Sequence, residues 1–290
     1  QPGHIGSNLR RSPVRTVVNK EVMGTLILAV TSLFLYSVGT ALQALHFRGR
    51  VQSNLAITTL IGVLALTSHG LLIGQTVHQS GGFDFSFFKS SMLISWLIVL
   101  LLLGLNLKKP VQSLFLGVYP LAILTIIMAL VAHGPSRLVS DQSYGMLSHV
   151  ALSVTAYSLF SLAAIQAVLL YVQNRQLKHN YNSLLVRNLP PLQTMESLLF
   201  EMVWAGVVLL ILAIVTGALF IQDLFAQDLA HKTVFSILSL MVFIALLIGR
   251  YTKGWRGITA SRWTLAGCLL LMLAFYGSKF VLELVFHRGG

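Results

Sequence analysis

The chain has very few cysteines and few charged residues. Its one cysteine, Cys268, excludes an intrachain disulfide, a CxxC redox pair, a CxxCH haem attachment motif and a thiolate zinc site, so a buried structural thiol is expected. Charged residues make up 10% of the chain, and only eight are acidic. No Ser-His-Asp spacing, phosphate-binding loop or pair of catalytic carboxylates stands out, so we do not expect an enzyme.

Long apolar segments dominate instead. Hydrophobic residues make up 56% of the 290 residues, and eight runs reach the roughly 20 residues that a helix needs to cross a bilayer. The expected spans are residues 25–45, 54–78, 85–107, 111–132, 144–172, 198–225, 233–250 and 263–286. We therefore expect an all-α polytopic transmembrane helical bundle, with one transmembrane domain over residues 23–290.

The basic residues predict how the bundle is oriented. Eleven Lys and Arg lie in the loops after spans one, three, five and seven, and three lie in the other loops: the first group is Arg48, Arg50, Lys108, Lys109, Arg175, Lys178, Arg187, Arg250, Lys253, Arg256 and Arg262, and the second is Lys89, Arg137 and Lys232. By the positive-inside rule the first group is cytoplasmic, so both termini are expected to be non-cytoplasmic. The formal charge of +12 reflects this topology, and we expect a lipid bilayer and no nucleic acid as partner.

Residues 1–22 do not fit this orientation. They carry Arg10, Arg11, Arg15 and Lys20 on the side expected to be outer, and they show no hydrophobic period. Met23 directly precedes the first span. We expect residues 1–22 to be a poorly ordered extension that is not native.

Histidine is unusually frequent, with nine in the chain. Five are expected toward the outer side: His69, His78, His133, His149 and His231. Small and polar residues recur at helical spacing on two faces, Thr58-Gly62-Ala65-His69-Thr76 and His149-Ser153-Ala156-Phe160. Such faces let membrane helices approach closely, so His69 and His149 are expected to point into the bundle.

Two inward imidazoles on separate spans fit the needs of a haem. Haem iron accepts imidazole on both faces of the porphyrin, while the ring is buried among apolar groups and the propionates seek cations. His69 and His149 would be the axial ligands, and Arg137 a propionate partner. Two other interpretations stay open: each histidine forms a hydrogen bond across a helix interface or faces a small polar cavity, or outer histidines bind another metal such as zinc or copper. The weaker candidates for metal ligation are His78, His133 and His231.

Three stretches of the second half carry a family resemblance. They are "GMLSHVALSVTAYSLFSLAAIQAVLLY" at 145–171, "LPPLQTMESLLFEMVWAGVVLLILAIVTGALF" at 189–220 and "HKTVFSILSLMVFIALLIGRYTKGWRGITASRWTLAGCLLLMLAFYGS" at 231–278. They resemble the integral membrane cytochrome c assembly proteins of the CcsA/CcmC type, most closely the YpjD branch, with a CcsA-like core at about 111–286. "LTSHGLLIG" around His69 is similar to the same branch. The resemblance implies a bacterial inner (plasma) membrane location and haem handling at the outer face by histidines near helix ends, where His149 falls.

The chain also departs from this family. Haem-handling members carry a tryptophan-rich, aspartate-containing outer loop, whereas residues 221–233 contain no tryptophan. Further family histidines are replaced at 248–250 and 276–279. These differences argue against haem export and for a haem held by His149 with His69.

The leading hypothesis is an inner-membrane protein that binds or passes haem b and assists cytochrome c maturation, with haem, the bilayer and an apocytochrome or other membrane-protein subunits as partners. One alternative is a permease or accessory subunit for a small solute or divalent metal cation, which would enter at the outer histidines with Asp223 or Asp228. Another is a structural partner of a second membrane protein, docked through residues 173–197.

Overall fold

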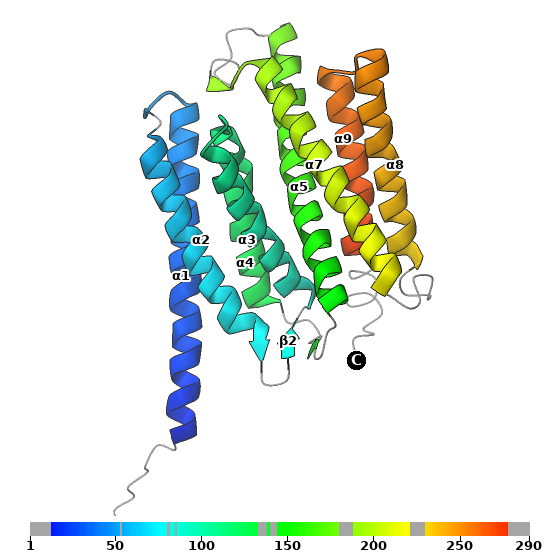
Figure 1. The fold of residues 1–290 in the computed structure, drawn as a ribbon. Helices are drawn as coiled ribbons and strands as arrows, with labels where there is room; N and C mark the ends of the chain where they lie inside the picture. The colour runs from blue at the N-terminus through cyan, green and yellow to red at the C-terminus, as the bar shows by residue number, and fades with distance from the viewer. Residues whose placement is uncertain are drawn as a thin grey trace, which may run out of the picture.

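In a computed structural model, the described residues form eight long helices and three very short strands (Figure 1). These residues are 13–52, 54–79, 82–84, 86–132, 138–139, 144–179, 188–220 and 230–277. The helices are α1 (Pro13–Phe47), α2 (Leu55–Val77), α3 (Phe87–Asn106), α4 (Phe115–Val131), α5 (Tyr144–His179), α7 (Leu192–Phe220), α8 (Ala230–Lys253) and α9 (Gly257–Met272). All eight are long and apolar enough to cross a membrane, which confirms the predicted bundle.

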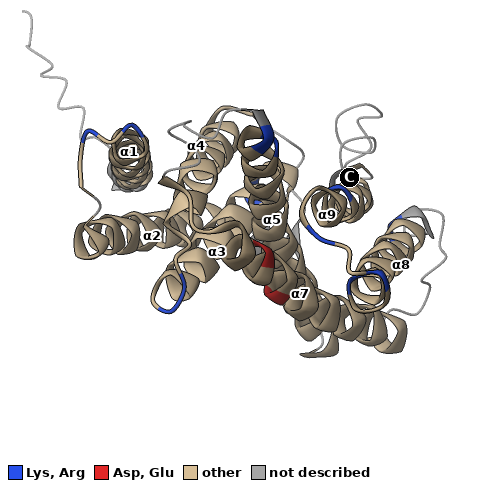
Figure 2. Ribbon diagram, turned by 90° about the horizontal axis from the view of Figure 1, so that it is seen from above, with Lys and Arg blue, Asp and Glu red and all other residues tan. Residues whose placement is uncertain are grey.

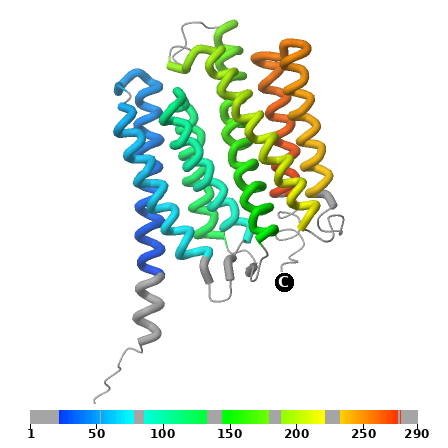
Figure 3. Tube along the Cα trace, viewed as in Figure 1, coloured from blue at the N-terminus to red at the C-terminus, as the bar shows by residue number. Residues whose placement is uncertain are grey.

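The helices form two neighbouring groups. In the first, α1 packs against α2 and α4, and α3 packs against α2 and α4; in the second, α5 packs against α7 and α9, and α8 against α9 and α7. The contact between α3 and α5 joins the two groups. Helices α1 and α8 lie at opposite edges of the molecule in both the side view and the end view (Figures 2 and 3).

Helices α7 and α9 each begin six residues earlier than their apolar runs predict. Helix α7 begins at Leu192 and α9 at Gly257, whereas the predicted spans start at residues 198 and 263. An apolar run marks only the part of a helix that crosses lipid. The helix itself can extend beyond that run, because its backbone hydrogen bonds do not depend on apolar side chains. Pro190 and Pro191 directly precede α7, as the proline tolerance of a helix start allows.

A small antiparallel sheet, which the sequence did not predict, lies at one end of the bundle. Strand β2 (Gly82–Asp84) pairs with β1 (His78–Gln79) on one side and with β3 (Leu138–Val139) on the other. It connects the end of α2 to the segment between α4 and α5. Helix α9 runs toward the same end of the molecule (Figure 1).

The basic loops gather at the opposite end, seen from above in Figure 2. Here Lys109, after α3, pairs with Glu201 of α7 at 3.0 Å, and Asn188 donates a hydrogen bond to the Phe47 carbonyl at 2.7 Å. Both contacts tie the first helix group to the second. Which side of the membrane this end faces stays a prediction.

Helix α1 already begins at Pro13, inside the expected extension 1–22, and residues 1–12 lie outside the described part.

Candidate functional site

His69 is fully buried in the first helix group, as predicted for an inward-facing residue. It lies on α2, and its Nδ1 is 3.2 Å from the hydroxyl of Tyr36 on α1. The two rings meet edge to face, with centroids 5.8 Å apart and an interplanar angle of 85°. The Nε2 atom of His69 is buried and has no hydrogen-bond partner among the described residues. One ring nitrogen is therefore hydrogen-bonded to a neighbour, while the other has no described partner.

Tyr119 of α4 extends this cluster toward the basic end. Its ring centroid is 5.2 Å from that of Tyr36. A Cβ at Gly39 of α1 would lie 2.6 Å from the Tyr119 ring, and one at Gly62 of α2 would lie 2.7 Å from its hydroxyl. The tyrosine thus occupies space that two glycines leave open, which is how small residues shape membrane helix contacts. The Tyr119 hydroxyl is buried without a described hydrogen-bond partner.

His149 lies near the start of α5 and faces α7. Its Nδ1 is 2.8 Å from the carbonyl oxygen of Ala213. Because a carbonyl only accepts, Nδ1 carries a proton and donates it, and in the neutral imidazole Nε2 keeps the lone pair. The ring lies against Gly217, where a Cβ would come within 2.9 Å of the imidazole Cε1. A backbone carbonyl that fixes the tautomer in this way is the usual support of a metal-binding histidine.

The predicted site residues are thus only partly placed. His69 contacts α1 and His149 contacts α7, so each imidazole is held by a different helix group. Both make the hydrogen bond across a helix interface that the alternative interpretation expects, and binding of one iron by both stays a prediction. His78 is in β1 and His231 is in α8, but their side chains are not described; His133 and Arg137 lie outside the described residues.

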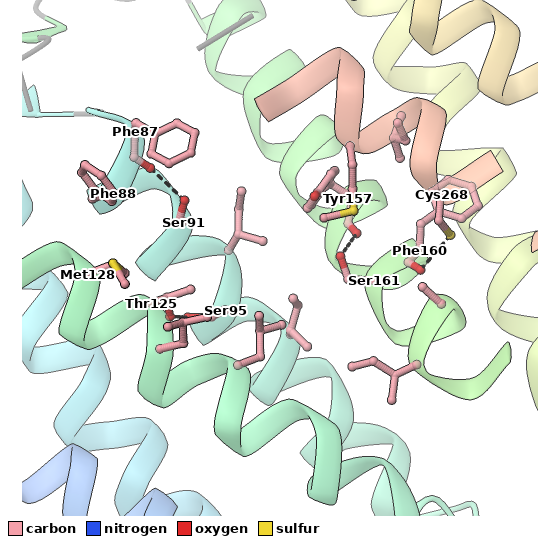
Figure 4. A pocket seen from close by; sticks show the side chains of 18 residues that line it. Phe87, Phe88, Ser91, Ser95, Thr125, Met128, Tyr157, Phe160, Ser161 and Cys268 are labelled. Atoms are coloured by element: carbon pink, nitrogen blue, oxygen red, sulfur yellow. Dashed lines mark hydrogen bonds between the residues drawn. The ribbon is translucent and has the colours of Figure 1, made fainter. Parts of the chain in front are cut away.

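An apolar cavity that the sequence did not reveal lies between the two helix groups (Figure 4). Its volume is about 420 Å³, and residues from α3, α4, α5 and α9 line it. Phe87 and Phe88 lie on its α3 side, and Tyr157 and Phe160 on its α5 side. Neither His69 nor His149 is among the lining residues.

Most hydroxyl groups in this cavity are already satisfied. Ser91 and Ser161 donate to backbone carbonyls of their own helices, and Ser95 bonds Thr125 at 2.6 Å. Cys268 is buried and its thiol donates to the Phe160 carbonyl at 3.3 Å, as expected for a structural cysteine. Ser91 and Ser95 are spaced four apart within an apolar run, a pattern that could have indicated this helix face. Their hydrogen bonds to carbonyls of α3 and to Thr125 make the face effectively apolar.

A preformed metal site with three or more protein ligands is not found in the described part of the chain. No group of three or more His, Cys, Asp or Glu side chains there is arranged to hold a metal ion. A haem needs only one or two protein ligands, so the oriented imidazole of His149 is the feature with clear ligand chemistry.

Comparison with known proteins agrees with the resemblance. The family model of the cytochrome C assembly protein matches residues 57–286. The chain is similar to inner membrane protein YpjD of Escherichia coli strain K12, at 30% identity over 89% of this chain and 99% of that protein. It is also similar to protein HemX of Brevibacillus brevis, at 27% identity over 85% of this chain and 93% of that protein.

A more distant relative extends the comparison to a protein with a stated role. The cytochrome c biogenesis protein CcsA of Guillardia theta is 20% identical over 76% of this chain and 81% of its own length. No solved structure matches the chain significantly. The match to the family model covers α2 through α9 and includes both His69 and His149, and the chain belongs to the cytochrome c assembly protein family.

Proposed function

We propose that this protein is a bacterial inner-membrane haem-binding protein that assists cytochrome c maturation without catalysing bond chemistry itself. The observation that carries the proposal is the hydrogen bond from His149 Nδ1 to the Ala213 carbonyl, which presents Nε2 as a ligand in a fixed tautomer. Membership of the cytochrome c assembly family supports haem as the ligand. The name of the Escherichia coli relative supports the inner membrane as the location.

His149 would bind the iron through Nε2 at the end of the bundle that carries the short sheet. Ala213 holds the imidazole by its backbone, so the ring orientation does not depend on a second side chain. The iron and porphyrin of haem b would supply the redox-active group that an apocytochrome finally receives. His69 and Arg137 remain the predicted second axial ligand and propionate partner.

The site residues present fit one axial ligand well and a second less directly. His69 has the required unpaired nitrogen, and Tyr36 orients its ring. It is, however, enclosed by the first helix group, and the structure gives it no contact with His149. The two imidazoles therefore need separate tests.

The first experiment is optical spectroscopy of the protein purified with haem from native membranes. Wild type is expected to show a Soret band, and His149→Ala is expected to lose it because the oriented Nε2 is gone. His46→Ala is the matched control, since His46 lies at the opposite end of the bundle and bonds the Val51 carbonyl. Equal Soret bands in wild type and His149→Ala would refute His149 as ligand.

His69→Ala then separates the two versions of the site. Loss of the Soret band in this variant supports ligation of one iron by both histidines. A retained but shifted band supports His149 as the axial ligand together with a different group. A protein that stays colourless in wild type, with intact helix content by circular dichroism, contradicts haem binding as a whole.

A further inference from the structure

The α8–α9 loop, defined together with the adjoining helix turns as residues 250–262, concentrates basic charge at one end of the bundle. Residues 250–262 contain four Lys or Arg and no Asp or Glu. The acidic side chain in contact with this loop, Glu196 of α7, is buried, with its side chain only 6% exposed. The exposed charge of this segment is therefore positive, and Figure 2 marks Lys and Arg residues at the ends of α8 and α9.

The loop is held in one conformation. Gly254 and Gly257 adopt φ angles of +64° and +52°, which favour glycine. Glu196 accepts hydrogen bonds from the Gly257 backbone N–H and from Nε of Arg256, the latter at 3.1 Å. The backbone N–H of Trp255 donates a hydrogen bond to the Gly249 carbonyl, with an N···O distance of 3.1 Å. A rigid loop loses little conformational entropy when it binds a ligand.

Two guanidinium groups on this loop retain hydrogen-bonding capacity. Arg256 contacts Glu196 through Nε, while its side chain is 60% exposed. Arg250 lies over the Phe200 ring, with Cζ 3.8 Å from the centroid, and its Nη1 is buried without a described hydrogen-bond partner. A buried guanidinium N–H without a partner is unfavourable, so an acceptor beyond the described residues would stabilise Arg250 here.

The helices and tryptophans beside the loop favour a place near the lipid headgroups. It joins two helices that are each long and apolar enough to cross the membrane. Trp255 and Trp263 stack with centroids 4.9 Å apart, and tryptophan is enriched at the membrane–water interface. Lys253 is exposed, and its Nζ lies 5.9 Å from the Trp255 ring centroid.

We propose that Arg250, Lys253 and Arg256 form a binding site for the headgroup of an anionic phospholipid, seated on the α8–α9 loop beside Trp255. The headgroup phosphate supplies the negative charge that this loop lacks and accepts hydrogen bonds from the guanidinium edges. The inference concerns the basic end of the bundle and is independent of haem binding at His149.

Native mass spectrometry of the full purified chain tests the site, with phosphatidylglycerol and phosphatidylcholine added in turn. Wild type is expected to retain phosphatidylglycerol and not phosphatidylcholine. Since one basic side chain near an anionic headgroup contributes about fivefold in affinity, Lys253→Gln is expected to weaken phosphatidylglycerol binding about fivefold and Arg250→Gln/Lys253→Gln about 25-fold. Lys253→Gln changes an exposed side chain, so it keeps the test valid if the double variant fails to fold.

The matched control removes the same charge elsewhere on the same end. Arg48→Gln/Arg50→Gln changes two exposed basic residues of the α1–α2 loop and is expected to leave phosphatidylglycerol binding unchanged. An equal loss in this control would overturn the proposal, because binding would then follow total charge. Equal retention of phosphatidylcholine, or displacement of the lipid by inorganic phosphate alone, would also overturn it.

Discussion

At the scale of single residues, His149 and His69 differ in what their neighbours allow. The Ala213 carbonyl fixes the tautomer of His149, because a carbonyl can only accept. The Tyr36 hydroxyl does not fix that of His69, because a hydroxyl can donate or accept. The neutral ring of His149 is therefore held in one tautomer, whereas the proton on His69 can occupy either nitrogen.

Gly217→Ala tests whether the packing of His149 matters. The new Cβ would lie 2.9 Å from Cε1 and 3.1 Å from Nδ1 of the ring, so the imidazole must move away from Ala213. We expect a loss of about 1–3 kcal/mol in the free energy of unfolding from overpacking, together with a weaker Soret band. Thermal unfolding and absorbance measure the two effects.

Gly74→Ala is the matched control on α2. A Cβ there meets no atom within 4 Å, so this variant is expected to gain about 0.5–1 kcal/mol from the better helix propensity of alanine. If Gly217→Ala is as stable as Gly74→Ala and keeps its Soret band, the close contact with His149 has no role.

The two buried tyrosines are expected to respond differently to the same substitution. Tyr36→Phe removes a hydrogen bond to His69 and should lower the free energy of unfolding by about 0.5–1.5 kcal/mol. Tyr119→Phe removes a hydroxyl that has no described partner, so its stability should be unchanged or slightly higher. Thermal unfolding in detergent measures both, and an equal loss in Tyr119→Phe would show that a bound water satisfies its hydroxyl.

At the scale of elements, α7 shows how burial decides how much a carboxylate contributes to stability. Its two glutamates both pair with basic residues that precede or follow other helices. Glu196 is buried and bonds Arg256 and the first backbone N–H of α9, while Glu201 and Lys109 are 54% and 40% exposed. Water screens the second pair, whereas the first one holds the start of α9 against α7.

Alanine at each position separates these roles. Glu196→Ala is expected to lower the free energy of unfolding by about 2–3 kcal/mol, because two charge-assisted hydrogen bonds are lost. Glu201→Ala is expected to change it by less than about 1 kcal/mol. Chemical or thermal unfolding of both variants, side by side, checks the difference; similar losses would mean that burial does not distinguish the two pairs.

At the scale of the whole molecule, the distribution of charge predicts which end faces the cytoplasm. Arg50 lies at the basic end, and Tyr144, 92% exposed, begins α5 at the other end. With Cys268 buried, a cysteine introduced at either place is the accessible thiol among the described residues. Tyr144→Cys is expected to react with a membrane-impermeant maleimide in intact spheroplasts, and Arg50→Cys only after permeabilisation. The reverse pattern would contradict the predicted orientation.

The sequence by itself determined the number of spans and the family. In lipid, the backbone polar groups of a single apolar segment must be paired within that segment, and an α-helix is the structure that pairs them all. The residues around His69 and His149 also sufficed to nominate them, since polar side chains within apolar runs are scarce. Helix ends were less well determined, as the early starts of α7 and α9 show.

Only the tertiary structure decided which helix faces meet. Lipid tails are as apolar as leucine, so hydrophobicity does not distinguish a face turned to lipid from one turned to protein. The insertion of Tyr119 between Gly39 and Gly62, and the partners of the two histidines, depend on contacts between residues distant in sequence. The cavity between the helix groups and the contact of the α8–α9 loop with Glu196 also depend on packing between distant segments, which no local sequence pattern encodes.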